Sequence, residues 1–258
     1  MGGEDVEDEE LLWTQPVVAT ESAAGSASSD DDEDDAATTR EPARKKAKTP
    51  QQVLLQSGRN LSEQTTKEQA VFLNTALQHY RLLRGHHDET TPPLPAVLPH
   101  FLIPPSQGTL LERIRSAISM QQIKKQWKHK SCPCVLIVCL SARRSVAVLK
   151  ELASLQLRAF KLFPKSGSIA EHTSMLQSVA PCPLAVGTPH RLLALQSVLR
   201  LDHTRLVVLD GCCSQKQYTV CTLPDTAPHC MEWLERVVLP QVVKKKKTGE
   251  PSCNIAFL

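Results

Sequence analysis

The stretch PLAVGTPHRLLALQSVLRLDHTRLVVLDGCC, residues 183–213, decides the fold. Residues 184–186 form an apolar run too short for a helix, a glycine and a proline interrupt it, and residues 192–199 repeat apolar side chains at helical spacing. Residues 205–209 then give a second apolar run, which stops at Asp210. Continuous apolar runs joined by a crossover helix are typical of buried parallel strands in a βαβ unit. We therefore expect binding residues at the carboxyl ends of these strands.

Helices and strands alternate on both sides of this unit. Apolar runs predict further strands at residues 135–140, 159–163 and 253–258. Helical spacing predicts helices over residues 65–84, from residue 109, and over residues 145–155, 169–179 and 230–243. The first two helices begin with candidate capping boxes, Thr65 with Glu68 and Thr109 with Glu112. This alternation indicates an α/β fold in which a parallel sheet carries helices on both faces.

The beginning of the chain differs from the rest in charge. Residues 1–39 contain thirteen Asp and Glu and no Lys or Arg, so the remaining 14 acidic residues face all 30 basic ones. A segment with this much like charge and few large apolar residues is predicted to be disordered. The basic remainder is typical of a protein that faces nucleic acid or an acidic partner, and a merely solvated basic surface is the plainer alternative.

These patterns divide the chain into three parts. We predict a disordered acidic tail with a short basic cluster at residues 1–60, a helix and a proline-rich connector at residues 61–106, and a folded α/β domain at residues 107–258. Residues 92–105 of the connector fit either a polyproline ligand or an extended segment lying along the core. The apolar residues between its prolines favour the second interpretation.

Two islands interrupt the acidic tail. An apolar plug, a candidate peptide for docking into a partner or else a stray hydrophobic spot, consists of Leu11, Leu12 and Trp13. A basic cluster, a candidate nuclear import signal or else ordinary solvated charge, consists of Arg44, Lys45, Lys46 and Lys48.

The nine cysteines predict free thiols in a reducing compartment. The chain starts with acidic residues where a secretory leader would be basic and then apolar, and no apolar run reaches the roughly 18 residues of a membrane span. His129, Cys132 and Cys134 lie close in sequence but lack the paired spacing of a structural zinc site. We expect a soluble protein without a metal.

Enzymatic motifs are missing from the sequence. It contains neither the phosphate loop GxxxxGK[ST] nor the nucleophile elbow GxSxG. Gly108 and Thr109 have the position of a phosphate-loop remnant, and Asp210 follows a strand where a magnesium-binding acid would be expected. No second carboxylate accompanies Asp210, so we expect no catalytic residue and no cofactor, and Asp210 also fits a simple turn cap.

Positive side chains follow three consecutive predicted strands. Arg143 and Arg144 follow the first, Lys165 follows the second and Arg191 follows the third. Thr188 adds a hydroxyl group beside the start of a helix, and such groups together suit a phosphate oxygen. The sequence therefore predicts a phosphate-binding rim at the carboxyl ends of the strands, with a solvated rim that binds nothing as the alternative.

Four stretches also resemble a known family. VLIVCLSARRSVAVLKEL (135–152), KSGS (165–168), VGTPHRL (186–192) and LVVLDGCC (206–213) resemble the first RecA-like domain of DEAD-box RNA helicases, where PTREL, GG, TPGR and DEAD occur in this order. The resemblance implies a partial RecA-like domain whose retained motifs contact an RNA backbone, while the motifs that handle ATP are lost. By this resemblance the RNA-binding residues are Ser141, Gly167, Thr188 and Arg191, with His190 in place of a glycine.

The acidic tail, Trp13 followed by Gln15 and Pro16, and the helicase-like remnant together are similar to the Cms-type ribosomal small subunit homologue family. The similarity covers residues 95–258 and the island around Trp13. It implies a nuclear factor, expected in the nucleolus, that takes part in early assembly of the small ribosomal subunit with pre-ribosomal RNA and assembly proteins as partners.

We accordingly predict a non-enzymatic factor that binds RNA or ribonucleoprotein through its strand-end rim. One alternative is a protein-interaction scaffold that does not bind RNA, and another is a divergent ATPase with an unrecognised nucleotide site. No membrane and no small-molecule substrate are expected as partners.

Overall fold

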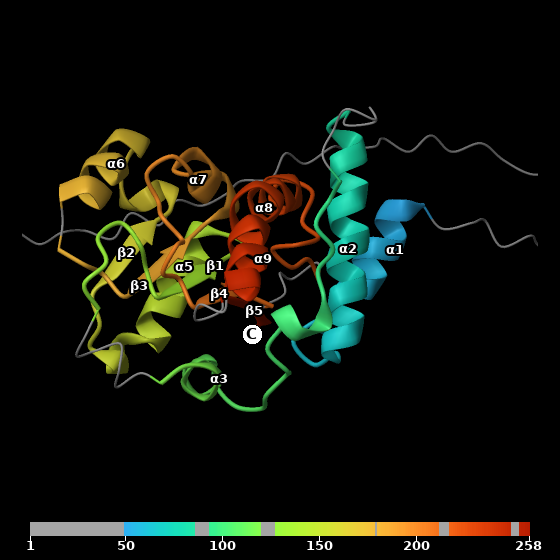
Figure 1. The fold of residues 1–258 in the computed structure, drawn as a ribbon, viewed down its shortest axis with the longest axis horizontal. Coiled ribbons are helices and arrows are strands. Elements are labelled where there is room, and N and C mark those ends of the chain that lie inside the picture. The colour runs from blue at the N-terminus through green and yellow to red at the C-terminus, as the bar shows by residue number, and fades with distance from the viewer. Residues whose placement is uncertain (1–48, 86–92, 120–126, 179, 212–216, 249–252) are drawn as a thin grey trace, which may run out of the picture. The chain divides into compact units, whose positions relative to one another are not determined.

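Five parallel strands form one sheet in the order β2-β3-β1-β4-β5 (Figure 1). Their bounds are β1 Val135–Val138, β2 Ala159–Leu162, β3 Leu184–Gly187, β4 Leu206–Leu209 and β5 Asn254–Phe257. The register places the first residues of β1, β3 and β4 side by side, since Val135 pairs with both Leu184 and Leu206. The carboxyl ends of the strands therefore meet at one edge, as predicted from the sequence.

This computed structural model describes residues 49–85, 93–119, 127–178, 180–211, 217–248 and 253–258. All of them belong to the compact unit formed by residues 47–258. The acidic block, the apolar plug of Leu11, Leu12 and Trp13, and the basic cluster of Arg44, Lys45, Lys46 and Lys48 lie outside the described residues. None of the helices in the described ranges has the length and apolar character needed to cross a membrane.

Helices cover both faces of the sheet. Their bounds are α1 Pro50–Ser57, α2 Thr66–Leu83, α3 Leu110–Ala117, α5 Ala142–Glu151, α6 Ile169–Ser178, α7 Pro189–Ala194, α8 Ala227–Trp233 and α9 Leu239–Thr248. Leu136 and Val138 of β1 share one apolar core with residues from α2, α7, α8 and α9. Val135 and Ile137 face the other core, with α3 and α5. This alternation within continuous apolar strands confirms a parallel α/β sheet buried on both faces.

The predicted capping boxes are present. Thr65 accepts a hydrogen bond from the backbone N–H of Glu68, and Glu68 in turn accepts one from the backbone N–H of Thr65. Thr109 and Glu112 form the same pair at the start of α3. Each box satisfies backbone donors that the first helical turn leaves without intrahelical partners.

Residues 50–57, which their composition places in the disordered tail, form helix α1 instead. Thr49 caps this helix through a capping box with Gln52, and Pro50 occupies its first turn. The apolar side chain of Leu54 is buried in the larger core. A strong amino-terminal cap and one buried leucine outweigh a polar composition, because Pro fits the first turn of a helix without loss of a hydrogen bond.

Three other helices differ from the predicted ranges. The helix expected at residues 145–155 is α5, which begins at Ala142 after its cap Ser141 and ends at Glu151, with a separate 3-10 turn, η2 (Ala153–Leu155), behind it. The helix expected at residues 192–199 is α7, which begins at Pro189 and ends at Ala194, because the buried Leu195 and Leu199 lie in the turn that follows. The helix expected at residues 230–243 is interrupted by a π-helical turn, η4 (Leu234–Val238), just before Pro240. A proline in a helix interior clashes with the carbonyl four residues earlier, and a widened turn relieves the clash.

The described part of the proline-rich connector lies along the core as an extended segment. Val97 exchanges two hydrogen bonds with the Asn74 side chain of α2, at 2.8 and 2.9 Å. Leu102 then bridges Ile255 of β5 in parallel fashion, and the N–H of Ile103 donates to the carbonyl of Ile255 at 2.8 Å. A short 3-10 helix, η1 (Pro99–Phe101), interrupts this segment, and residues 93–105 otherwise line the core as an extended chain.

Candidate nucleic-acid interface

The carboxyl ends of β2, β3 and β1 lie side by side and bring the predicted rim residues to one edge. Leu162, Gly187 and Val138 are register partners in adjacent strands, so the loops that follow them adjoin. These loops carry the predicted residues Ser141, Arg143, Arg144, Lys165, Gly167, Thr188, His190 and Arg191. We call this edge the carboxyl rim.

Arg191 is buried beneath the carboxyl rim and does not face solvent. Its side chain is 8% exposed, and its Nη1 donates to the carbonyl oxygen of Gly167 at 2.9 Å and lies 3.2 Å from His172 Nδ1. Gly167 has φ +152°, a conformation that L side chains rarely adopt, so the close approach of its carbonyl depends on glycine. In this structure Arg191 ties the β2 and β3 loops together, and its contact with a phosphate stays a prediction that falls to the remaining Nε.

His172 completes this network and was not predicted from the sequence. It projects from α6 into the protein and is 2% exposed. Burial, followed by the adjacent charge of Arg191, lowers its pKa, so the ring is neutral at pH 7. Since Nδ1 accepts from Arg191, Nε2 carries the hydrogen and donates to Ser166 Oγ at 3.2 Å. The sequence offered only a lone histidine at a buried helical position as a signal.

The lowered pKa of His172 predicts a loss of stability on acidification. An unfolded histidine titrates at about 6.5, above the folded value, so the unfolded state binds more protons below that pH. We expect the urea midpoint of the full chain to fall as pH decreases from 7 to 5. His129, whose pKa is also lowered, adds to this loss, so His172→Gln should make the decline shallower without abolishing it. An equally steep decline in this variant would contradict the assignment.

Two buried polar atoms of the rim have no partner within the described part of the chain. They are the hydroxyl oxygen of Thr188, a residue that is 7% exposed, and Nε of Arg191. The ion pairs found in the described ranges do not include Arg191 either. Each such atom costs about 1–3 kcal/mol when it is left unsatisfied. An oxygen-rich anion at this point would satisfy both a hydroxyl and a guanidinium group.

Arg144 is held inside the structure by two carboxylates. Its Nε and Nη2 donate to the two oxygens of Asp210 at 2.8 and 3.0 Å, and Nη1 contacts Glu151 at 2.7 Å. The side chain of Asp210 is 1% exposed, and the two hydrogen bonds from the Arg144 guanidinium compensate its buried charge. Arg144 is thus engaged by two carboxylates, and the RNA contact predicted for it from its position stays a prediction. Ser141 is likewise engaged, because its hydroxyl accepts from the Arg144 backbone as the cap of α5.

Asp210 and Gly108 share a small pocket of about 250 Å³. The start of α3 at this pocket is satisfied by its own carboxylate, because Glu112 Oε2 accepts from both the N–H and the hydroxyl of Thr109, at 2.8 and 3.0 Å. Both oxygens of Asp210 point to Arg144. The two places where a nucleotide phosphate and its magnesium ion would be expected thus have partners from the chain itself.

Three predicted rim residues expose their side chains: Arg143, Lys165 and His190. The His190 ring meets that of His229 edge to face, with centroids 5.1 Å apart. Arg143 follows β1 and Lys165 follows β2, so they flank the loop after β3 that holds Thr188 and Arg191. The exposed positive charge of the rim therefore comes from the loops after the two strands that flank β3.

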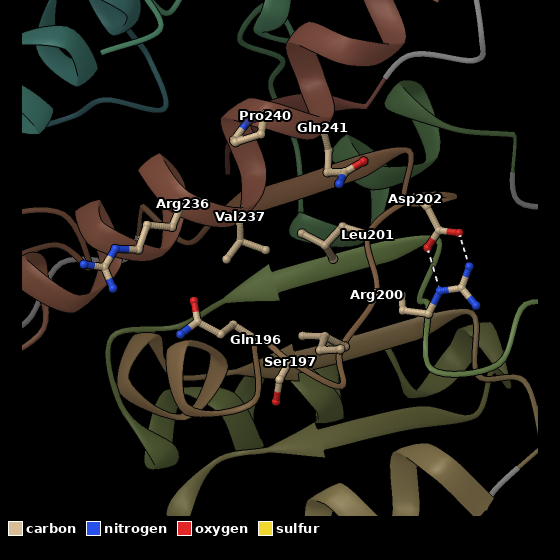
Figure 2. A pocket seen from close by; sticks show the side chains of 10 residues that line it. Gln196, Ser197, Arg200, Leu201, Asp202, Arg236, Val237, Pro240 and Gln241 are labelled. Carbon is tan, nitrogen blue, oxygen red and sulfur yellow. Dashed lines mark hydrogen bonds and ion pairs between the residues drawn. The ribbon is translucent and has the colours of Figure 1, made fainter. Parts of the chain in front are cut away.

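A larger open pocket of about 480 Å³ lies between the turn after α7 and the helix that contains Pro240 (Figure 2). Arg200 and Asp202 form an ion pair at one end of it. At the other end, Arg236 pairs with Glu232 at 2.7 Å. Both arginines of this pocket are thus paired with carboxylates, so neither offers an uncompensated positive charge to an anion.

The described cysteines behave as buried free thiols, namely Cys132, Cys134, Cys139, Cys182, Cys221, Cys230 and Cys253. Burial raises the pKa of Cys134 to about 12, which keeps that thiol protonated. In the ranges that the structure covers, His, Cys, Asp and Glu side chains form no group of three that could hold a metal ion.

Comparison with known proteins adds information on family. Residues 101–250 match the model of a family described as "CMS1: U3-containing 90S pre-ribosomal complex subunit". Protein CMSS1 of Danio rerio is 31% identical over 120 residues, which are 45% of this chain and 41% of that protein. The match to this relative therefore spans less than half of its length. The family match includes β1 to β4 and all residues of the carboxyl rim.

Proposed function

The chain belongs to the CMS1 family of U3-containing 90S pre-ribosomal complex subunits, and from this we propose that it is a non-enzymatic RNA-binding factor in ribosome biogenesis. Within that role we assign it to the early small-subunit pathway, with pre-ribosomal RNA and assembly proteins as partners. In this proposal the protein is located in the nucleus, and within it in the nucleolus.

The observation that carries the RNA-binding proposal is the pair of unpartnered polar atoms at the carboxyl rim. Thr188 Oγ1 and Arg191 Nε lie buried after β3, and the exposed residues Arg143 and Lys165 follow β1 and β2, the strands on either side of β3. A phosphate oxygen would satisfy the buried atoms, while the exposed cations meet the neighbouring phosphates. In this proposal Arg191 shapes the loops and the two exposed residues supply the salt-dependent attraction.

The ion pair of Arg144 with Asp210 supports a protein that does not hydrolyse nucleotides. A carboxylate that serves a magnesium ion must offer an oxygen to the metal, but both oxygens of Asp210 accept hydrogen bonds from Arg144. Glu112 places a negative charge at the start of α3, where it would repel a phosphate group. Resemblance to the helicase domain then reflects an inherited scaffold whose RNA-facing loops remain in use.

Replacement of both exposed rim cations tests the RNA-binding proposal. For the full chain, we expect Arg143→Ala with Lys165→Ala to weaken binding to single-stranded RNA and to reduce the slope of log affinity against log salt by about 1.4, because each phosphate contact contributes about 0.7. The measurement is fluorescence anisotropy over a salt series, with and without ATP and Mg²⁺. Affinity should not respond to the nucleotide.

Lys67→Ala is the matched control, because Lys67 is exposed at the start of α2. This helix packs beside β5 through Phe72 and Phe257, and β5 is the strand farthest from β2 in the sheet. A double variant with the parent's affinity and salt slope would disprove the rim assignment. Absence of RNA binding by the parent protein at every salt concentration would favour the protein-scaffold alternative.

A further inference from the structure

A second group of cations lies at the opposite, amino-terminal edge of the sheet. Five exposed basic residues stand in the segments that lead into β1, β2 and β4: Lys128, Lys130, Arg158, Arg200 and Arg205. The structure describes one carboxylate in these segments, that of Asp202, which pairs with Arg200 and lies 3.3 Å from His203 Nε2. We call these five residues the amino edge. The edge carries more exposed positive charge than the carboxyl rim does.

Three aromatic rings stand among these cations. The rings of His129 and His203 are stacked, with centroids 3.6 Å apart and planes at 20°. Trp127 meets His129 edge to face at 4.9 Å. His203 is 48% exposed at its side chain, so the stack reaches the surface. Trp127 and His129 are half-buried, so His203 is the exposed ring of the three. Cationic side chains beside an exposed ring are the combination that single-stranded nucleic acids require.

Backbone contacts around Cys132 hold the stack in place. The indole N–H of Trp127 donates to the carbonyl of Cys132 at 2.9 Å, and the N–H of His203 donates to Cys132 Sγ at 3.3 Å. Arg200 is fixed to the same turn, because its N–H donates to the carbonyl of Ser131 at 2.8 Å. The rings therefore come from two chain segments that the pairing of β1 with β4 keeps together.

The environment of His129 disfavours a positive charge on its ring. Burial, then the neighbouring His203, lowers the pKa of His129, while Asp202 opposes this and Arg200 and Arg205 add to it. A neutral imidazole allows the two rings to lie face to face without repulsion. A base can stack on such a ring because every base has a π-face.

We propose that the amino edge is a second RNA-contact surface, at which a base of a single strand stacks on His203 while flanking phosphates meet Lys128, Lys130 and Arg205. The ligand class rests on the function proposed above, but the site does not depend on the carboxyl rim, from which the strands separate it. An acidic peptide would satisfy the cations yet would leave the exposed ring without a stacking partner. The stack therefore favours RNA.

The stacking contact can be followed through Trp127. In the full chain with Trp13→Phe, the remaining tryptophans are Trp127 and the fully buried Trp233. We expect a decanucleotide of single-stranded RNA to quench the emission. His203→Ala should weaken affinity about tenfold, as expected for the loss of one stacked base. Its salt slope should stay unchanged, whereas Lys128→Ala with Lys130→Ala should lower the slope.

Matched variants separate stacking from other effects. His100→Ala removes another exposed histidine that lies against an aromatic ring, Phe101, and should leave affinity unchanged. His203→Phe keeps a ring at the site and should restore binding. An abasic oligonucleotide should bind the parent and His203→Ala equally well. Thermal melting of each variant verifies that it is folded.

Two results would overturn the proposal: parental RNA affinity in His203→Ala, or equal competition by an acidic peptide for the quenched state. Repetition in the Arg143→Ala, Lys165→Ala background distinguishes the two surfaces. If those rim substitutions change nothing and His203→Ala still weakens binding, the rim assignment fails and the amino edge stands. If the rim substitutions weaken binding and His203→Ala has no effect, the amino-edge assignment fails and the rim assignment stands.

Discussion

Arg144→Ala lowers the free energy of unfolding by about 3–5 kcal/mol, because removal of one partner leaves the buried carboxylate of Asp210 without its counter-charge. This is the largest single effect that we expect from a polar residue of this chain. Urea unfolding at pH 7, followed by circular dichroism, measures it. The neighbouring Arg143→Ala should stay within about 0.5 kcal/mol, since the side chain of Arg143 is exposed.

The companion change Asp210→Asn in the Arg144→Ala background should recover part of this loss. A neutral amide at residue 210 no longer requires a counter-charge, so the double variant should be more stable than Arg144→Ala alone. A double variant as unstable as the single one would show that the loss comes from packing of the arginine stem and not from the unpaired charge.

Arg191→Ala destabilises the protein by about 2–3 kcal/mol and weakens RNA binding, although the side chain is buried. The substitution removes the charged donor to the Gly167 carbonyl and to His172 Nδ1, and hydrogen bonds from a charged group contribute about 1.5–3 kcal/mol each. The β2 and β3 loops then lose the link that fixes the carboxyl rim. Urea unfolding and RNA anisotropy of the same protein samples measure both effects.

His172→Ala and the double variant complete the test of Arg191. Because the two side chains are in contact, their effects on stability should be less than additive. Arg191→Lys keeps a positive charge but lacks the rigid planar guanidinium that directs Nη1 at both acceptors, so it should rescue neither stability nor binding fully. Additive losses would mean that His172 does not position Arg191.

The elements of the sheet were predictable because their signals are local. Residues 184–186 and 206–209 are uninterrupted apolar runs, and the two capping boxes are short motifs whose geometry depends on three or four residues. The position of the carboxyl rim followed from the rule that parallel strands end at one edge. The observed sheet is parallel and is covered by apolar cores on both faces, as the sequence predicts.

The chemical state of the rim residues was not predictable in the same way. Arg144 and Asp210 are 66 residues apart, and only the pairing of β1 with β4 brings them together. Arg191 looks like an exposed cation until α6 supplies His172 and the β2 loop supplies the Gly167 carbonyl. Helix α1 was not predicted because only Leu54 of its eight residues is buried, which leaves no apolar repeat at helical spacing. Contacts distant in sequence decided each of these outcomes.

The proline-rich segment beside β5 also protects the sheet from growth at that border. After the single bridge of Leu102 to Ile255, Pro104 and Pro105 have no N–H to continue a ladder. At the other border, β2 exposes the charged side chain of Lys161 from its centre. Prolines and lysines on edge strands are devices that keep strands of separate molecules from joining. Both borders are therefore ill suited to edge-to-edge aggregation, so the sheet stays at five strands within one molecule.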